Sequence, residues 1–191
     1  MKQFEKFNLT MKSSAIWSHS TDNGEIHSAI LHDYQIYHYP KPPLAIFNDN
    51  LFRIGSSLRG AKDAAEAILG STSMFPFMID LEHKNVWFPS KSPANIGCVW
   101  FALHAIKLPL DISQEETKVI LHGGLSMNIP VSFRSFKSRC HAAHILRSKS
   151  LDNQYPQPFI YGKPRKEITV ICDDYRVKYT VKEKKEGYEE L

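Results

Sequence analysis

The stretch "TKVILHGGLSMNIPVSFRSFKSRCHAAHILRSKS", residues 117–150, changes its hydrophobic period once, from strand-like to helix-like. Two short runs meet at Gly123-Gly124, a pair that tolerates the positive φ of a tight hairpin turn. From Phe133 onward apolar residues recur with helical spacing, and Ser132 stands in the N-cap position. The stretch therefore predicts a hairpin that leads directly into a helix, which indicates an α+β fold.

Similar local signals predict the other elements. Ser56 or Ser57 can cap a second helix that Gly70 ends. Alternation and turn signals predict one or two strands over 25–40, a strand, turn and strand over 44–55, a hairpin over 75–90, strands over 98–108 and 167–174, and a frayed helix from 181. We expect the aromatic residues of 87–88 and 100–101 to pack in the core. The sum is a β-rich single domain of antiparallel hairpins with two helices, at about 56–69 and 133–149.

Length and composition set the domain organisation. The chain has 191 residues, 42% of them hydrophobic, which is enough to bury a substantial core. We expect a loosely ordered N-terminal segment at 1–24, a core domain at 25–150 and a C-terminal extension at 151–191. Three separated cysteines without a CxxC pair predict a reduced, cytoplasmic chain. We expect no signal peptide and no membrane span, because no apolar run is long enough.

Positive charge is concentrated in the middle of the chain. The 24 Lys and Arg exceed the 20 Asp and Glu by four, and residues 51–150 hold twelve basic against seven acidic side chains. On a helical wheel, the helix at 133–149 places an apolar stripe beside a basic stripe. The apolar stripe comprises Phe133, Phe136, Cys140 and Ala143, and the basic stripe comprises Arg134, Lys137, His141 and His144, while Arg139, Arg147 and Lys149 complete the cations of the helix.

Two interpretations of this basic helix remain open. Cations near a helix C-terminus favour the helix dipole, and a polar face can simply be solvated. However, a solvated face usually mixes signs to form i,i+4 ion pairs, whereas residues 131–149 hold five Lys or Arg and no Asp or Glu. A polyanionic partner explains this absence of carboxylates, because each one would repel phosphate.

A second candidate contact region lies at 53–62. Arg53, Arg59 and Lys62 surround Ser56 and Ser57, which stand at the predicted start of a helix. Serine hydroxyls and helix N-terminal amides can hold phosphate. The same residues also fit a capped helix start with ordinary surface cations, and both interpretations stay open.

Catalytic and metal chemistry find little support. The sequence contains no G-x-S-x-G, no P-loop and no G-x-G-x-x-G. Cys140 and His144 lie one helical turn apart, but no pair of ligands with the short spacing of a zinc site accompanies them. We therefore expect no enzyme, no catalytic residue, no metal and no cofactor.

Five short stretches stand in a characteristic order: "LFRIGSSLRGAK" (51–62), "FPFMID" (75–80), "VWFPS" (86–90), "CVWF" (98–101) and "PVSFRSF" (130–136), with Arg147 further on. In this order and spacing they resemble the competence transcription factor ComK family. Two positions depart from the family pattern. Ala61 follows Gly60 where a basic residue is usual, and Gly123-Gly124 stands where an Asn-Gly type of turn is usual.

The resemblance implies a DNA-binding activator of DNA-uptake genes in the bacterial nucleoid. Such proteins bind paired A·T-rich boxes of double-stranded DNA largely through the minor groove, bend the DNA, act as dimers or tetramers and aid RNA polymerase. An adaptor of the MecA type delivers them to a Clp protease. In this chain the expected DNA-binding residues are Arg53, Ser56, Ser57, Arg59, Lys62, Arg134, Lys137, Arg139, Arg147 and Lys149, and the expected adaptor-recognition residues are Phe159, Ile160 and Tyr161.

The resemblance also suggests a use for the C-terminal extension, residues 151–191, in oligomerisation or adaptor recognition. A different class of function stays open beside it. A β-rich module that binds protein or RNA, and is not an activator, can use the same basic helix. RNA binding would require aromatic side chains that stack on bases.

Overall fold

A computed structural model of the chain describes residues 6–70, 74–154, 166–173 and 176–183, with side chains as far as residue 150. The chain divides into two units, residues 1–151 and residues 152–191. The second unit contains an antiparallel hairpin of β10 (Lys166–Asp173) and β11 (Arg176–Glu183). The strand predicted at 167–174 is thus confirmed for its described residues, whereas the helix predicted from 181 is wrong for residues 181–183, which belong to β11.

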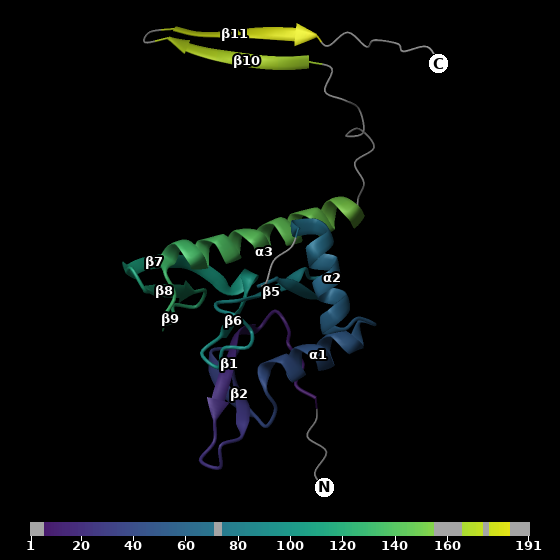
Figure 1. Cartoon of the computed structure of the whole chain (residues 1–191), viewed down its shortest axis with the longest axis vertical. Helices are drawn as coiled ribbons and strands as arrows, with labels where there is room; N and C mark the ends of the chain where they lie inside the picture. The colour runs from purple at the N-terminus through teal and green to yellow at the C-terminus, as the bar shows by residue number, and fades with distance from the viewer. Residues whose placement is uncertain (1–5, 71–73, 155–165, 174–175, 184–191) are drawn as a thin grey trace. The chain divides into compact units, whose positions relative to one another are not determined.

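The first unit is built mainly from antiparallel hairpins (Figure 1). Its strands are β1 (Ser13–Ser20), β2 (Ile26–His32), β3 (Gln35–Tyr39), β4 (Phe77–Asp80), β5 (Asn85–Pro89), β6 (Val99–Ala102), β7 (Ile106–Ser113), β8 (Glu116–Leu121) and β9 (Ser126–Ile129). Its helices are α1 (Pro43–Arg53), α2 (Leu58–Leu69) and α3 (Phe133–Gln154), and the 3₁₀ turn η1 (Leu103–Ala105) joins β6 to β7. The predicted α+β class of antiparallel hairpins is confirmed, but the described residues form three α-helices rather than two.

Within the described residues the first unit contains two sheets. One has six strands in the order β3-β2-β1-β6-β5-β4, and the other has three in the order β7-β8-β9. The predicted hairpin at Gly123-Gly124 joins β8 to β9, and both glycines have a φ of 86°. The predicted strand at 98–108 is interrupted, because β6 ends at Ala102 and η1 turns the chain from the first sheet into the second.

In the segment at 44–55, residues 44–53 belong to helix α1, which corrects the predicted strand, turn and strand. Pro43 occupies the first turn of α1, where its fixed φ suits a helix and its missing N–H costs nothing. Ile46, Phe47 and Leu51 are buried at helical spacing. The side chain of Asn50 accepts a hydrogen bond from the N–H of Leu9 (3.0 Å) and donates to the Ile46 carbonyl (2.8 Å). Tertiary packing therefore overrides the turn preference of the Asn-Asp-Asn sequence.

The N-terminal segment contains strand β1, which corrects the expectation that 1–24 is loose. Strand β1 lies inside the six-stranded sheet, between β2 and β6. Ala15 and Ile16 are fully buried, and the hydroxyl of buried Ser13 bonds to Nδ1 of His32 at 2.8 Å. The polar residues of this strand concealed its position in the sequence, because partners on other strands satisfy them.

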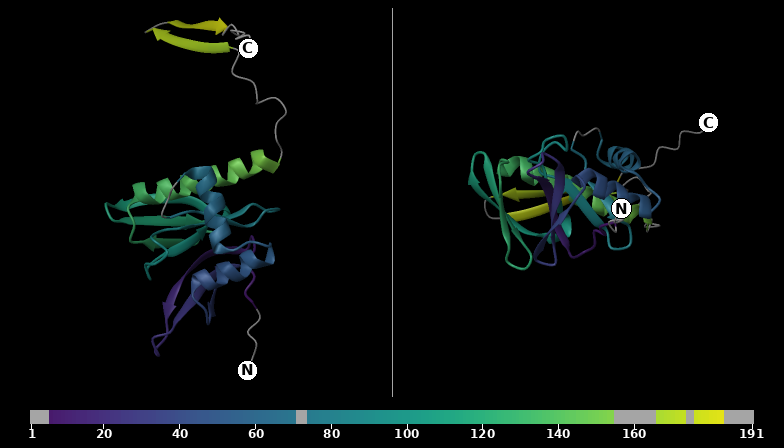
Figure 2. Two further views of the ribbon diagram at one scale, coloured as in Figure 1. Left: turned by 45° about the vertical axis from the view of Figure 1, so that its right-hand side comes forward. Right: turned by 90° about the horizontal axis from the view of Figure 1, so that it is seen from below.

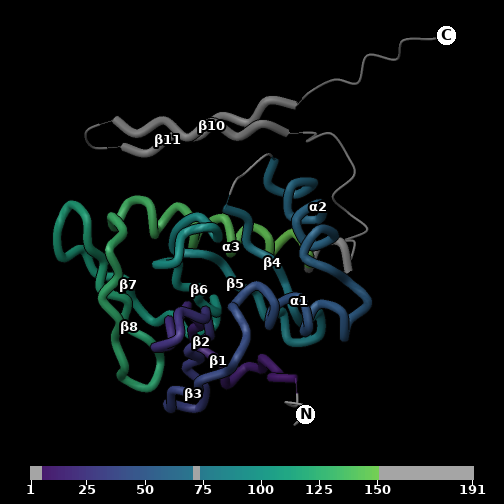
Figure 3. Tube along the Cα trace, turned by 60° about the horizontal axis from the view of Figure 1, so that its bottom comes forward, coloured from purple at the N-terminus to yellow at the C-terminus, as the bar shows by residue number. Residues whose placement is uncertain are grey.

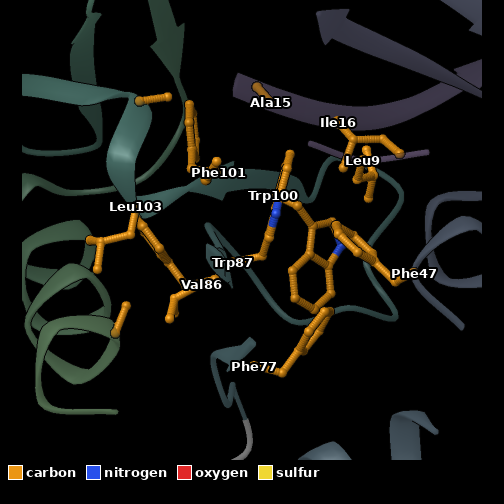
Figure 4. Close-up of a cluster of buried hydrophobic side chains, with 14 of the residues drawn as sticks. Leu9, Ala15, Ile16, Phe47, Phe77, Val86, Trp87, Trp100, Phe101 and Leu103 are labelled. Atoms are coloured by element: carbon orange, nitrogen blue, oxygen red, sulfur yellow. The ribbon is translucent and has the colours of Figure 1, made fainter. Parts of the chain in front are cut away.

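The core lies on both sides of the six-stranded sheet. On one side Phe47 from α1 packs against Phe77, Trp87 and Trp100, with ring centroids 5.0 to 5.3 Å apart (Figure 4). On the other side Phe136 from α3 packs against Phe88 and Phe101, at 5.6 and 5.5 Å. Successive residues of a strand point to opposite faces, so the adjacent aromatic pairs 87–88 and 100–101 supply one ring to each side. Their predicted core positions are confirmed.

Helix α3 is thus fixed along one side of the strands, with α1 on the other side (Figure 2). Among the described residues, no helix combines the length and the apolar character needed to cross a membrane.

Candidate nucleic-acid interface

Helix α3 has one buried side and one exposed side. Phe136, Ala143 and Leu146 are buried against the core, which confirms the predicted apolar stripe in its main part. The helix begins as predicted, because the Ser132 hydroxyl accepts the N–H of Ser135 at 3.4 Å. The exposed side carries Arg134, Lys137, Ser138, His141, His144, Ser148 and Lys149.

Residues 133–150 of α3 include several cations and no carboxylate. The sequence contains no Asp or Glu between Glu116 and Asp152. In the part of the chain that the structure describes, no ion pair involves a cation of α3. The ammonium group of Lys137 lies 5.4 Å from the ring centroid of Phe133, a cation–π contact that does not neutralise its charge. We name Arg134, Lys137, His141, His144 and Lys149 the basic face of α3.

The imidazole of His144 can add charge to the basic face under acidic conditions. Partial burial lowers the pKa of His144, and the positive charge of Arg147 and the neighbouring His141 act in the same direction. An approaching phosphate would oppose this shift, because an anion stabilises the protonated imidazole. The basic face therefore gains charge when the pH falls or when a polyanion binds.

Two cations predicted to bind DNA are turned away from the basic face. Arg139 is half-buried and donates a hydrogen bond to the carbonyl oxygen of Ser90, at the end of β5. Burial lowers the pKa of Arg139. Arg147 is half-buried, and its charge helps to lower the pKa of His104, for which burial is the larger cause. Both residues lie on the side of α3 that faces the strands, a direction set by the tertiary structure.

The second predicted region, 53–62, forms the corner between α1 and α2. The Ser57 hydroxyl accepts the N–H of Gly60 at 3.1 Å, so the predicted N-cap of α2 is confirmed. A further N-terminal amide, that of Leu58, donates to the side chain of Asn48 at 3.3 Å. These two amides of α2 already have partners inside the protein, which reduces what this helix end can offer to a phosphate.

The outer side of α2 carries balanced charge. Exposed Arg59 and Lys62 share it with Asp63 and Glu66, and Lys62 lies 3.6 Å from Glu66 as an i,i+4 ion pair. Mixed signs of this kind are typical of a solvated helix. The charges on the outer side of α2 are therefore balanced, whereas residues 133–150 of α3 carry no negative charge.

An apolar hollow brings the two predicted regions together. It lies between α2, β4 and the C-terminal part of α3, and Ile54, Ala61, Leu81, Leu146 and Ser150 line it. Figure 3 traces the backbone of these three elements. Its volume is about 180 Å³. The hollow runs along α2, so Ile54 of the corner and Leu146 of α3 line one cavity.

The corner also exposes apolar side chains that the sequence analysis missed. Phe52 is 59% exposed and Ile54 is 40% exposed, on either side of exposed Arg53. Gly55 follows with a φ of 73° and lets the chain turn sharply into α2. One sequence signal could have indicated these exposed residues, because Phe52 and Ile54 flank Arg53 directly before Gly55. It went unused because the segment was predicted to form strands.

Metal ligands do not gather in the described residues, where no group of three or more His, Cys, Asp or Glu side chains is placed to hold an ion. Cys140 belongs to the packed side of α3, and burial raises the pKa of its thiol. The adaptor-recognition residues predicted at 159–161 lie outside the described residues.

Comparisons with known proteins agree with the sequence resemblance. Residues 4–154 match the protein family described as ComK protein. The competence transcription factor of Bacillus subtilis (strain 168) is 25% identical over 158 residues, which cover 80% of this chain and 82% of that protein. No solved structure matches the chain.

Proposed function

The chain belongs to the ComK family, and from this premise we propose that it is a DNA-binding activator of competence genes. The relative of the same family is named a competence transcription factor. One observation supports the proposal for particular residues. The basic face of α3 is exposed, and residues 133–150 include no carboxylate. Such a face attracts the phosphate backbone of duplex DNA.

The dimensions of α3 decide what it contacts. Arg134 and Lys149 are separated by about 22 Å along the helix, at about 1.5 Å per residue. A helix with side chains is about 10–12 Å wide, whereas the minor groove of B-DNA is about 6 Å wide. If recognition uses the minor groove, α3 cannot enter it as a helix. The basic face then lies across the groove and contacts phosphates on its rims.

The corner between α1 and α2 is the better candidate for insertion. Arg53 is the kind of side chain that a narrow A·T-rich minor groove attracts, because its negative potential is enhanced there. Exposed Phe52 and Ile54 are of the type that wedges between base steps and kinks the duplex. In this arrangement Ser56 and Ser57 support the turn, Arg59 and Lys62 contribute little, and Arg139 and Arg147 hold α3 in place.

The finer features come from the family resemblance and complete the proposal. The protein binds paired A·T-rich boxes as a dimer or tetramer, bends the DNA and aids RNA polymerase. Because the minor groove distinguishes A·T from G·C and little else, two boxes at a fixed spacing must supply much of the specificity. A MecA-type adaptor then recognises Phe159, Ile160 and Tyr161 in the C-terminal extension and presents the chain to a Clp protease.

The test is a set of duplexes with one or two A·T-rich boxes at varied helical phasing. We expect tighter binding to two boxes in phase, loss of binding when a minor-groove dye is added, and slower gel migration of a centrally bent complex. Equal affinity for every duplex would contradict paired recognition. Preference for single-stranded RNA over duplex DNA in competition would favour the interaction module instead.

The adaptor role has a separate test. A chain with Phe159→Ala and Tyr161→Ala should bind DNA normally and should persist longer than the unmodified chain when adaptor, protease and ATP are supplied. Equal degradation of both chains would contradict recognition through these residues.

A further inference from the structure

Strand β7 presents an apolar row at the edge of the three-stranded sheet. It is the end strand in the order β7-β8-β9, so within the described residues only β8 pairs with it. Leu108, Leu110 and Ile112 are 47%, 39% and 47% exposed. Soluble proteins usually protect such an edge, because an exposed hydrophobic edge strand is ready to meet another strand. The row therefore requires a partner surface.

The sequence of β7 is complementary to itself when reversed. In "IKLPLDI", residues 106–112, apolar residues alternate around a central Pro109, with Lys107 on one side and Asp111 at the same distance on the other. Antiparallel strands related by a twofold axis at Pro109 would place Leu108 opposite Leu110. Each Lys107 would then face an Asp111 of the other strand, and opposite charges in such positions stabilise a sheet.

We propose that β7 is a self-association surface, on which a second copy of this chain binds edge to edge through a twofold axis near Pro109. A twofold contact requires a surface that complements itself, and the Lys107–Asp111 pattern has this property. A contact with a different protein would not use the symmetric placement of Lys107 and Asp111 about Pro109.

Two features limit the contact to a closed pair of chains. Pro109 has no N–H to contribute to a ladder, and the register of β7 with β8 shifts on both sides of the segment 108–111. Side chains therefore provide most of the contact, and the irregular ends discourage further strand addition. The inference deepens the proposed function, since a protein that reads two boxes needs two copies, but its test uses no DNA.

The experiment measures the mass of the full chain in solution at about 1 to 100 μM, a range in which weak dimers dissociate. The unmodified chain should form dimers. Lys107→Glu places two like-charged pairs in the contact, and Asp111→Lys does the same with the opposite sign. Each variant alone should raise the dissociation constant by about tenfold or more. Lys84→Glu, in the turn between β4 and β5 and outside β7, is the matched control and should leave the dimer unchanged.

Mixing the two variants gives the sharpest result. A chain with Lys107→Glu and a chain with Asp111→Lys together restore an attractive pair at both ends of the contact. The mixture should therefore form a heterodimer although neither chain associates alone, and failure of the mixture to associate would overturn the proposed register. A monomeric unmodified chain, or dimers that persist in both variants and in Leu110→Lys, would overturn the β7 surface. Circular dichroism confirms that each variant is folded, and DNA binding is measured separately on every variant.

Discussion

The ring of Tyr34, in the turn between β2 and β3, lies against the backbone of Gly123, in the turn between β8 and β9. A Cβ atom built at Gly123 would stand 1.9 Å from Cε1 of Tyr34. The contact joins the turns of two hairpins that belong to different sheets. Both residues have positive φ, 64° for Tyr34 and 86° for Gly123, so both turns use the left-handed region.

Gly123→Ala should therefore destabilise the protein more than Gly124→Ala does. Both glycines have a φ of 86°, so each substitution costs about 1–2 kcal/mol for the left-handed backbone. A Cβ at Gly124 meets nothing within 4 Å, whereas the one at Gly123 must displace the Tyr34 ring. Chemical denaturation gives the difference. The difference should disappear in a Tyr34→Ala background, and an equal cost in both backgrounds would show that the ring contributes nothing.

The basic face of α3 should dominate the salt dependence of DNA binding. Replacing Arg134 and Lys137 by alanine should weaken binding to all duplexes. It should also lower the slope of log affinity against log salt by about one for each phosphate that the variant no longer neutralises. Replacing Arg59 and Lys62 should change the slope less, because Glu66 pairs with Lys62 and Asp63 adds a second negative charge to the same helix. Fluorescence anisotropy at several salt concentrations measures both slopes. A larger effect from the α2 pair would show that the wrong helix has been assigned to phosphate.

Arg139→Ala should act on stability rather than on phosphate binding. The substitution leaves the buried carbonyl of Ser90 without its charged donor, which costs about 1–3 kcal/mol of unfolding free energy. Urea denaturation should show this loss, while the salt slope of DNA binding stays that of the unmodified chain. Lys149→Ala is the control and should give the reverse pattern. A reduced slope in folded Arg139→Ala would return this residue to the DNA-contacting set.

Stability should fall as the solution becomes acidic, in part because of His104. Burial lowers the pKa of His104, Nε2 donates to the Met11 carbonyl at 2.8 Å, and the buried Nδ1 has no partner among the described residues. Below the ordinary histidine pKa of 6.5 the unfolded chain binds a proton that the folded chain rejects. Proton linkage then makes the unfolding free energy decrease as the pH falls from about 7 to 5.

Two glutamine variants should change the loss of stability in acid in opposite directions. His104→Gln keeps a donor for the Met11 carbonyl and removes the titration, so the acid loss should become smaller. His83 has its pKa raised by Asp80, so it stabilises the folded chain below pH 6.5 and loses that effect as the pH rises. His83→Gln should therefore make the acid loss larger. Parallel pH profiles for His104→Gln and the unmodified chain would exclude the role given to His104.

Local sequence determined those parts of the fold whose signals lie within a few residues. The cap of α2 needs only Ser57 and the amide of Gly60, and the turn at Gly123-Gly124 needs only two residues that accept positive φ. The division of α3 into an apolar side and a basic face was predictable for the same reason, because helical spacing alone sets it.

Tertiary structure decided what depends on residues far apart in the chain. Phe136 is buried because Phe88 and Phe101 stand where α3 crosses the sheet. Arg139 lies away from the basic face because it bonds to the Ser90 carbonyl. Helix α1 and strand β1 escaped prediction because distant partners satisfy their polar residues. The sequence by itself thus determined which faces exist, through the periodicity of the backbone. Only packing, which selects one set of long-range partners for buried groups, determined which cations of α3 remain exposed.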